Sequence, residues 1–249
     1  MLGYALALVI GLSLGLLGGG GSILTVPVLH YVMGYGVKLA VPMSLVVVGI
    51  TSGVGAIAHW RGGNLSLPTA LAFAPPAIIG AVLGAQLGLK VSAELQLTVF
   101  AVVLLAAALS MWLGLAKRAV IASEAKPAGR KPLPLIALIG SAVGMLTGFV
   151  GVGGGFIYVP TLVLLGGLPM KQAIGTSLAL IMVSCLAGVV RYHGSLSLDW
   201  RVIALFTAIA LLGVAIGSRL VLHVSQTLLR RIFAAFLLLM GAFVLFWGR

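Results

Sequence analysis

The 249-residue chain is 61% hydrophobic and 7% charged, whereas roughly a quarter of the residues in an ordinary soluble domain are charged. These values indicate a multi-pass membrane protein. The acidic residues are Glu94, Glu124 and Asp199, which argues against enzymes built on paired carboxylates and against carboxylate-held divalent metals. The single cysteine, Cys185, excludes a disulfide framework and a CxxC redox or metal pair. The positive residues are scattered between apolar runs, unlike the basic stripe of a nucleic-acid-binding protein.

Apolar runs of about 20 residues are long enough to cross the hydrocarbon core of a bilayer. Eight such segments follow one another, over about residues 2–33, 39–60, 67–89, 95–116, 133–165, 172–190, 202–222 and 228–247. We expect the first segment to be a membrane span and not a removed signal peptide.

A proline-containing linker with five positive charges separates the fourth segment from the fifth. These charges are Lys117, Arg118, Lys126, Arg130 and Lys131. By the positive-inside rule, the linker is expected in the cytoplasm. We therefore predict an all-α polytopic protein with an N-terminal repeat over 1–116, a cytoplasmic basic linker over 117–132 and a C-terminal repeat over 133–249.

The division into repeats comes from an internal match at an offset of 133 residues. Within Gly15–Leu29, seven of fifteen positions are identical to the shifted sequence. The same register continues without a gap and pairs Lys38 with Lys171, Ala40 with Ala173, Ser44 with Ser177, Gly80 with Gly213, Gly84 with Gly217 and Phe100 with Phe233. Two homologous halves are typical of secondary transporters, whose substrate sites lie at the interface between repeats.

The first segment of each half is long and interrupted by glycine. A straight helix of 32 residues would span about 48 Å, which exceeds a bilayer core of about 30 Å. The interruptions are Gly18, Gly19, Gly20 and Gly21 in one half, and Gly151, Val152, Gly153, Gly154 and Gly155 in the other. A broken helix in a membrane must be buried in protein or face a watery cavity, and its free N–H groups suit an anion. We expect broken helices. The alternative is a glycine-rich packing face on unbroken helices.

The number of times each broken segment crosses the membrane decides how the halves are related. One crossing makes the halves parallel, whereas folding back gives each half an odd number of crossings and makes the halves inverted. With the linker inside, the inverted arrangement places ten Lys and Arg residues inside and five outside, and the parallel arrangement places nine and six. We favour inverted repeats because alternating access is built naturally that way. The parallel arrangement stays open at this point.

The motifs GLLGGGGSILTVPVL (Gly15–Leu29) and GFVGVGGGFIYVPTLVLLGGLPMKQAIGTSL (Gly148–Leu178), joined through a basic linker, resemble the TauE/SafE family of membrane transporters, the sulfite exporter group. The resemblance covers essentially the whole chain, although the first half has Val41–Ser44 where the second has Ile174–Ser177. It implies transport of small sulfur-containing anions, such as sulfite or organosulfonates, across the inner (plasma) membrane. It fixes neither the particular anion nor the oligomeric state, and a homodimer is left open.

Candidate anion-binding residues form three groups. The first contains the two glycine breaks, Gly18, Gly19, Gly20, Gly21, Gly151, Gly153, Gly154 and Gly155, together with Ser22 as a hydroxyl at a half-helix N-cap. The second contains hydroxyls near the start of the second helices, Ser44, Thr176 and Ser177, whose alternative is hydrogen bonding to their own helix. The third contains Gln86 and Arg219 at equivalent positions of the third helices, where snorkelling is the alternative for Arg219.

Basic residues also gather where the second helices end. His59 and Arg61 lie there in one half, and Arg191 and His193 in the other. They suit an electropositive vestibule that attracts anions, but we expect ordinary interfacial anchoring beside Trp60 and Tyr192.

No Asp or Glu falls within a predicted span, and no GxSxG or HExxH motif occurs. We therefore expect no enzyme activity, no catalytic residue, no metal and no cofactor. The expected partners are the anion and the lipid bilayer. The leading hypothesis is an exporter driven by the membrane potential, and the alternative is an anion channel without alternating access.

Overall fold

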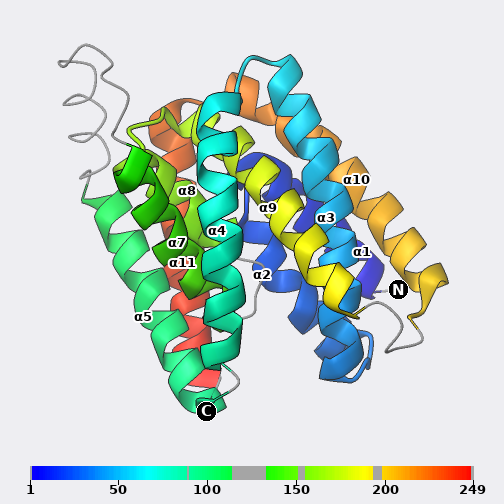
Figure 1. The fold of residues 1–249 in the computed structure, drawn as a ribbon. Coiled ribbons are helices and arrows are strands. Elements are labelled where there is room, and N and C mark those ends of the chain that lie inside the picture. Colours follow the sequence, from blue (N-terminus) through cyan, green and yellow to red (C-terminus); the bar gives the residue numbers. More distant parts are fainter. Residues whose placement is uncertain (1, 89, 114–132, 151–154, 193–197, 248–249) are drawn as a thin grey trace.

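The computed structural model describes residues 2–88, 90–113, 133–150, 155–192 and 198–247 (Figure 1). All regular elements within these ranges are helical. Those of the first half are α1 (Leu2–Leu17), α2 (Gly20–Pro27), the π-helical turn η1 (Val28–Val32), α3 (Val37–Arg61), α4 (Leu67–Gly88) and α5 (Ala93–Trp112). Those of the second half are α7 (Leu133–Val150), α8 (Gly155–Leu164), α9 (Met170–Tyr192), α10 (Trp200–His223) and α11 (Gln226–Trp247). The predicted linker over 117–132 and Gly151, Gly153 and Gly154 lie outside the described residues.

Five helices in the described part of the chain are long and apolar enough to cross a membrane. They are α3, α4, α9, α10 and α11, with mean hydropathies between 1.4 and 2.1. Large apolar side chains lie exposed along them, for example Leu71 and Ile79 on α4 and Leu212 on α10. Such side chains suit contact with lipid. The chain is therefore a polytopic, all-helical membrane protein, as its composition predicts.

The first long apolar segment is broken as predicted. The chain leaves α1 at Gly18, where φ is 71°, a conformation that glycine adopts at no steric cost, and it enters α2 two residues later. A Cβ on Gly21 would contact Leu14 of α1 at 3.1 Å, and Gly3 lies against the Met33 side chain. The α2–η1 segment therefore runs back along α1, so both ends of this hairpin lie at one end of the molecule.

Glycines build the seam between α1 and α10, which pack along each other. A Cβ on Gly11 would overlap the carbonyl group of Ala210, and a Cβ on Gly213 would overlap the backbone of Leu8. This close approach is the glycine-mediated packing typical of membrane helices. In Figure 1, α1 and α10 lie together on one side, away from α5 and α11.

The seam between α4 and α7 repeats the contacts of the α1–α10 seam between residues that the offset of 133 pairs with those of α10 and α1. Gly144 meets the backbone of Ala77, as Gly11 meets Ala210, and Gly80 meets the backbone of Ser141. The next most extensive pairs between the halves are α3 with α9 and α5 with α11, and α3 also packs against α10 and α4 against α9.

Helices α3 and α9 cross in opposite directions. Gly49 of α3 faces Cys185 of α9, whereas Gly53, one turn later, faces the earlier residue Met182. Moving along α3 therefore means moving backwards along α9. A shift of 133 residues places the first residues of α3, α4 and α5 at 170, 200 and 226, which are the first residues of α9, α10 and α11.

Candidate functional site

The glycine break of the first half contacts the second half in the protein interior. Gly18 touches the first turns of α9 at Ile174 and Ser177, and a Cβ on Gly19 would overlap the backbone of Gly155, the first residue of α8. All five residues are buried, and α2 lies near the middle of the molecule in Figure 1. Four predicted site residues, Gly18, Gly19, Gly155 and Ser177, are thus brought together.

Side chains from two other helices bind carbonyl groups at the end of α1. The last carbonyls of a helix have no partner within the helix. The Ser177 hydroxyl of α9 donates to the carbonyl oxygen of Gly18 and shares its hydrogen with the carbonyl oxygen of Ile174 in its own helix, at 2.7 Å. Nε2 of His59, on α3, lies 3.1 Å from the carbonyl oxygen of Gly15. The break is therefore held by hydrogen bonds from α3 and α9, which removes part of the cost of interrupting α1.

The position of His59 differs from the expectation of an interfacial anchor. Its side chain is 2% exposed and lies between the end of α1 and Gly175 of α9, where a Cβ would stand 2.7 Å from the Cβ of His59. Trp60 and Arg61, the next two residues, are exposed and fit the anchoring role. The structure does not describe the side chains of Arg191 and His193. A vestibule formed with them therefore stays a prediction.

The start of α2 has no side-chain cap. Its N-cap residue is Gly19, so the prediction that Ser22 occupies the N-cap is wrong. Ser22 is the third residue of α2, is buried, and donates from Oγ to the carbonyl oxygen of Gly19 at 2.7 Å. The first turn of α2 begins at Gly20 because the chain folds back from α1 at Gly18 and Gly19, and the sequence motif does not specify where this reversal ends. Gly20 lies against the Phe236 ring. The positive end of α2 therefore lies buried beside the break, which is an arrangement that favours negative charge.

The other predicted residues are not joined to the Gly18 break by the described contacts. Thr176 is buried and accepts a hydrogen bond at 3.0 Å from the backbone N–H of Ser66, in the turn before α4. Ser44 is buried on α3. Gln86 and Arg219 are exposed on α4 and α10, as snorkelling requires of Arg219.

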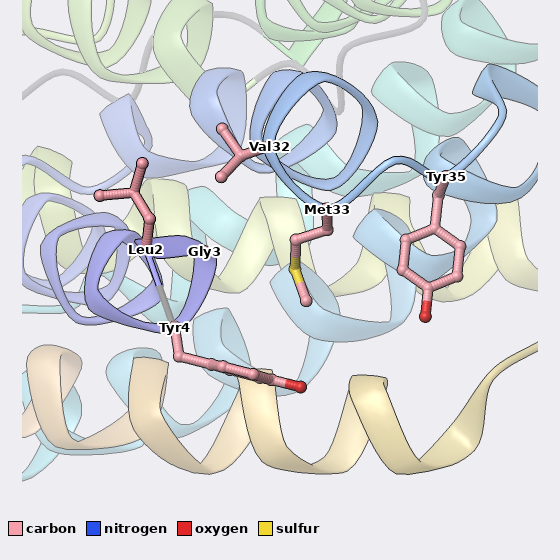
Figure 2. Close-up of a pocket in the computed structure, with 6 residues that line it drawn as sticks. All are labelled: Leu2, Gly3, Tyr4, Val32, Met33 and Tyr35. Atoms are coloured by element: carbon pink, nitrogen blue, oxygen red, sulfur yellow. The ribbon is translucent and has the colours of Figure 1, made fainter.

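A separate cavity of about 320 Å³ opens at the far end of the first hairpin (Figure 2). Its lining residues are Leu2, Gly3, Tyr4, Val32, Met33 and Tyr35, and none of them was predicted as a site residue. The Tyr35 hydroxyl donates to a carboxylate oxygen of Asp199 at 2.9 Å. Burial, and then the bond to Asp199, raises the pKa of Tyr35 to about 12. The Val202 N–H, followed by Tyr35, lowers the pKa of Asp199. This pair ties the entrance of α3 to the N-terminus of α10.

Comparison with known proteins identifies the family. The sulfite exporter TauE/SafE family matches residues 3–244. A probable membrane transporter protein of Xylella fastidiosa (strain 9a5c) is 31% identical over 95% of this chain and 91% of its own length. The probable membrane transporter protein YdhB of Bacillus subtilis is 24% identical over 84% of this chain and 85% of its own length. The chain therefore belongs to the sulfite exporter TauE/SafE family of membrane transporters.

Proposed function

We propose that the protein is a secondary transporter that exports a small sulfur-containing anion, sulfite or an organosulfonate, across the inner membrane. Family membership supports membrane transport. The observation that carries the location of the site is the contact of the Gly18–Gly19 break with Gly155 and Ser177 of the other half. A site shared by two halves changes whenever the halves move relative to each other.

In the proposed site, the anion accepts hydrogen bonds from N–H groups in the first turn of α2. This proposal is supported by the absence of a side-chain cap at that end and by the partial positive charge of a helix N-terminus. The hydroxyls of Ser22 and Ser177 donate to the carbonyl oxygens of Gly19 and Gly18 in this structure and would turn to the anion when it binds. We extend the site by the repeat to Gly151–Gly155 and Ser44. Thr176 positions the turn before α4. Gln86 and Arg219 are exposed, so they would meet the anion only outside the break and would not add to its affinity there.

We further propose that the two halves are inverted repeats. Three observations support this: the first hairpin returns to its starting end, α3 and α9 run in opposite directions, and the α1–α10 contacts recur between α7 and α4 with the halves exchanged. Each half then has one hairpin and three crossings. The basic linker and the start of α11 lie inside in this arrangement, and both chain ends lie outside.

Cysteine labelling tests the topology. Cys185 is buried and is first replaced by serine. Single cysteines are then placed at Gly36, Gly63 and Thr227. Inverted repeats predict that Thr227→Cys reacts from the same side as Gly63→Cys, whereas parallel repeats predict that it reacts from the same side as Gly36→Cys. The two reference positions are on opposite sides in both arrangements.

The membrane potential is sufficient to drive the proposed export. Moving one charge through 100 mV is worth about 2.3 kcal/mol, so a divalent anion leaving a negative interior gains about 4.6 kcal/mol, equal to roughly a thousandfold gradient. We expect sulfite efflux from proteoliposomes to increase with a clamped potential and to proceed without a pH gradient. An efflux rate that does not depend on the membrane potential would refute electrogenic export. Counterflow separates the carrier from a channel, which shows none.

A further inference from the structure

His59 is the one buried residue among the Lys, Arg and His side chains that the structure describes. A buried anion is costly unless it is paired and hydrogen-bonded. The described Lys and Arg side chains are exposed or partly exposed. A positive charge inside the described part of the protein can therefore come from His59.

The hydrogen bonding of His59 determines which ring nitrogen carries its proton. Nε2 lies 3.1 Å from the carbonyl oxygen of Gly15, and a carbonyl oxygen only accepts, so Nε2 carries the hydrogen. In a neutral imidazole the other nitrogen is then a bare acceptor. Nδ1 of His59 is buried and has no hydrogen-bond partner among the described residues. Buried polar atoms are usually paired, so an unpaired one requires an explanation.

The His59 ring lies beside the same elements as the glycine break. It binds the last turn of α1, which ends immediately before Gly18, and its Cβ lies against Gly175 of α9. The two neighbours of Gly18 on α9, Ile174 and Ser177, flank Gly175 in that helix. The unpartnered nitrogen is thus part of the junction of α1, α3 and α9 that holds the break.

We propose that His59 binds the transported anion and takes up a proton on Nδ1 when the anion enters. The inference rests on the proposed function, because it requires an anion at the break. The proton comes from water on the side where the anion enters and returns to water on the side where the anion leaves. Export of a dianion by this route moves one net negative charge, so it stays driven by the potential but gains half of the electrical free energy calculated for the anion alone. While it is bound, Nδ1–H donates to an anion oxygen, Nε2–H keeps its bond to Gly15, and a divalent anion with the imidazolium has a net charge of −1.

Other titratable groups on the helices around His59 do not account for the same pH dependence. The described titratable and charged side chains of α1, α3, α9 and α10 are Tyr4, Arg61, Lys171, Cys185, Arg201, Arg219 and His223. The Arg residues and His223 are exposed, and the Lys171 ammonium donates to the carbonyl oxygen of Leu222 at 2.9 Å. His223, an exposed histidine on α10, is the matched control.

The experiment measures anion binding to the purified full-length protein between about pH 5.5 and 8, where an unperturbed histidine titrates. The probes are thiosulfate and sulfoacetate, whose charge is constant in this range. Calorimetry in two buffers of different ionisation enthalpy counts the protons taken up. We expect proton uptake approaching one per anion, and affinity that falls by up to tenfold per pH unit, the limit for one linked proton.

His59→Gln distinguishes the role of Nδ1 from that of Nε2. The glutamine amide keeps an N–H donor for the carbonyl oxygen of Gly15 but has no equivalent of Nδ1. We expect this variant to bind at least tenfold more weakly, with no proton uptake, and His223→Gln to behave as the unmodified protein. Binding without proton uptake in the unmodified protein overturns the inference even if His59→Gln does not fold. Unchanged affinity and uptake in His59→Gln overturn it as well, and leave the proposed function intact. If the unmodified protein binds neither probe, the inference fails, and if it does not bind sulfite either, the proposed function fails as well.

Discussion

Replacement of Gly19 by alanine tests whether the contact between the two halves controls transport. In the structure, a Cβ at Gly19 would stand 2.9 Å from the Cα of Gly155 and closer still to its carbonyl group, whereas ordinary contacts begin at 3.4 Å. The neighbour is backbone at the start of α8, so no side chain can rotate away. Because the carbonyl group is the closest part, the tip of the first hairpin and the start of α8 must separate by roughly 1 Å.

Overpacking of this kind costs about 1–3 kcal/mol. Replacing glycine by alanine also restricts the unfolded chain, which offsets about 0.4–1 kcal/mol. We therefore expect a net destabilisation of about 1–2 kcal/mol. If a similar free energy is lost from anion binding at the displaced start of α2, transport falls by about tenfold, since each 1.4 kcal/mol corresponds to a factor of ten.

The assay combines a melting curve of the purified protein with sulfite flux in proteoliposomes. Gly36→Ala is the matched control, because a Cβ at Gly36 has no atom within 4 Å and its φ of −58° suits alanine. We expect Gly19→Ala to lower both the melting temperature and the flux, and Gly36→Ala to change neither. If the two variants have the same flux, the contact between the halves is not part of the transport site.

Three further predictions concern single side chains. Ser177→Ala should lower stability by about 1–3 kcal/mol, the cost of leaving a buried carbonyl without its partner, whereas Ser110→Ala, which removes a bond within its own helix, should have a smaller effect on the melting temperature. Because the pKa of Asp199 is lowered on folding, its stabilising effect should be complete above about pH 4, the unfolded value, and disappear as pH falls through the lower folded value. Melting curves below pH 4 should therefore be less pH-dependent for Asp199→Asn than for the unmodified protein. Arg219→Gln should leave thiosulfate affinity in detergent unchanged, because Arg219 is exposed. A loss of affinity would bring Arg219 into the binding site.

The positions of the long helices follow from the apolar pattern. The predicted segments 67–89, 172–190 and 202–222 each agree within two residues at both ends with α4, α9 and α10. A membrane makes this possible, since about 20 apolar residues are needed to cross it and polar turns must lie outside. The first break was predictable for the same reason, because its segment is too long for one crossing.

The burial of His59 could not be predicted in this way. Histidine followed by Trp60 and Arg61 at a helix end has the composition of an interfacial anchor. The ring is buried because Gly175 on another helix leaves room beside its Cβ, and because α1 ends nearby with a carbonyl group to bind. Both causes lie far from His59 in the sequence. They depend on how α3 packs against α1 and α9, which local pattern does not contain.

The glycines also show that the role of a residue depends on its neighbours in the fold. Gly11 and Gly18 are both buried in the first hairpin, and the sequence offers packing and helix breaking as competing explanations for such residues. The structure contains both: Gly11 lets α10 approach α1 within an intact helix, whereas Gly18 turns the chain at a positive φ. The absence of a Cβ permits either role, so the residue type alone does not distinguish them. What distinguishes them is the neighbour. Gly11 meets the backbone of a parallel helix along a seam, whereas Gly18 accepts a hydrogen bond from Ser177 of the other half. A break that the other half must stabilise is also one that movement of the other half can alter, and a packing seam has no such property.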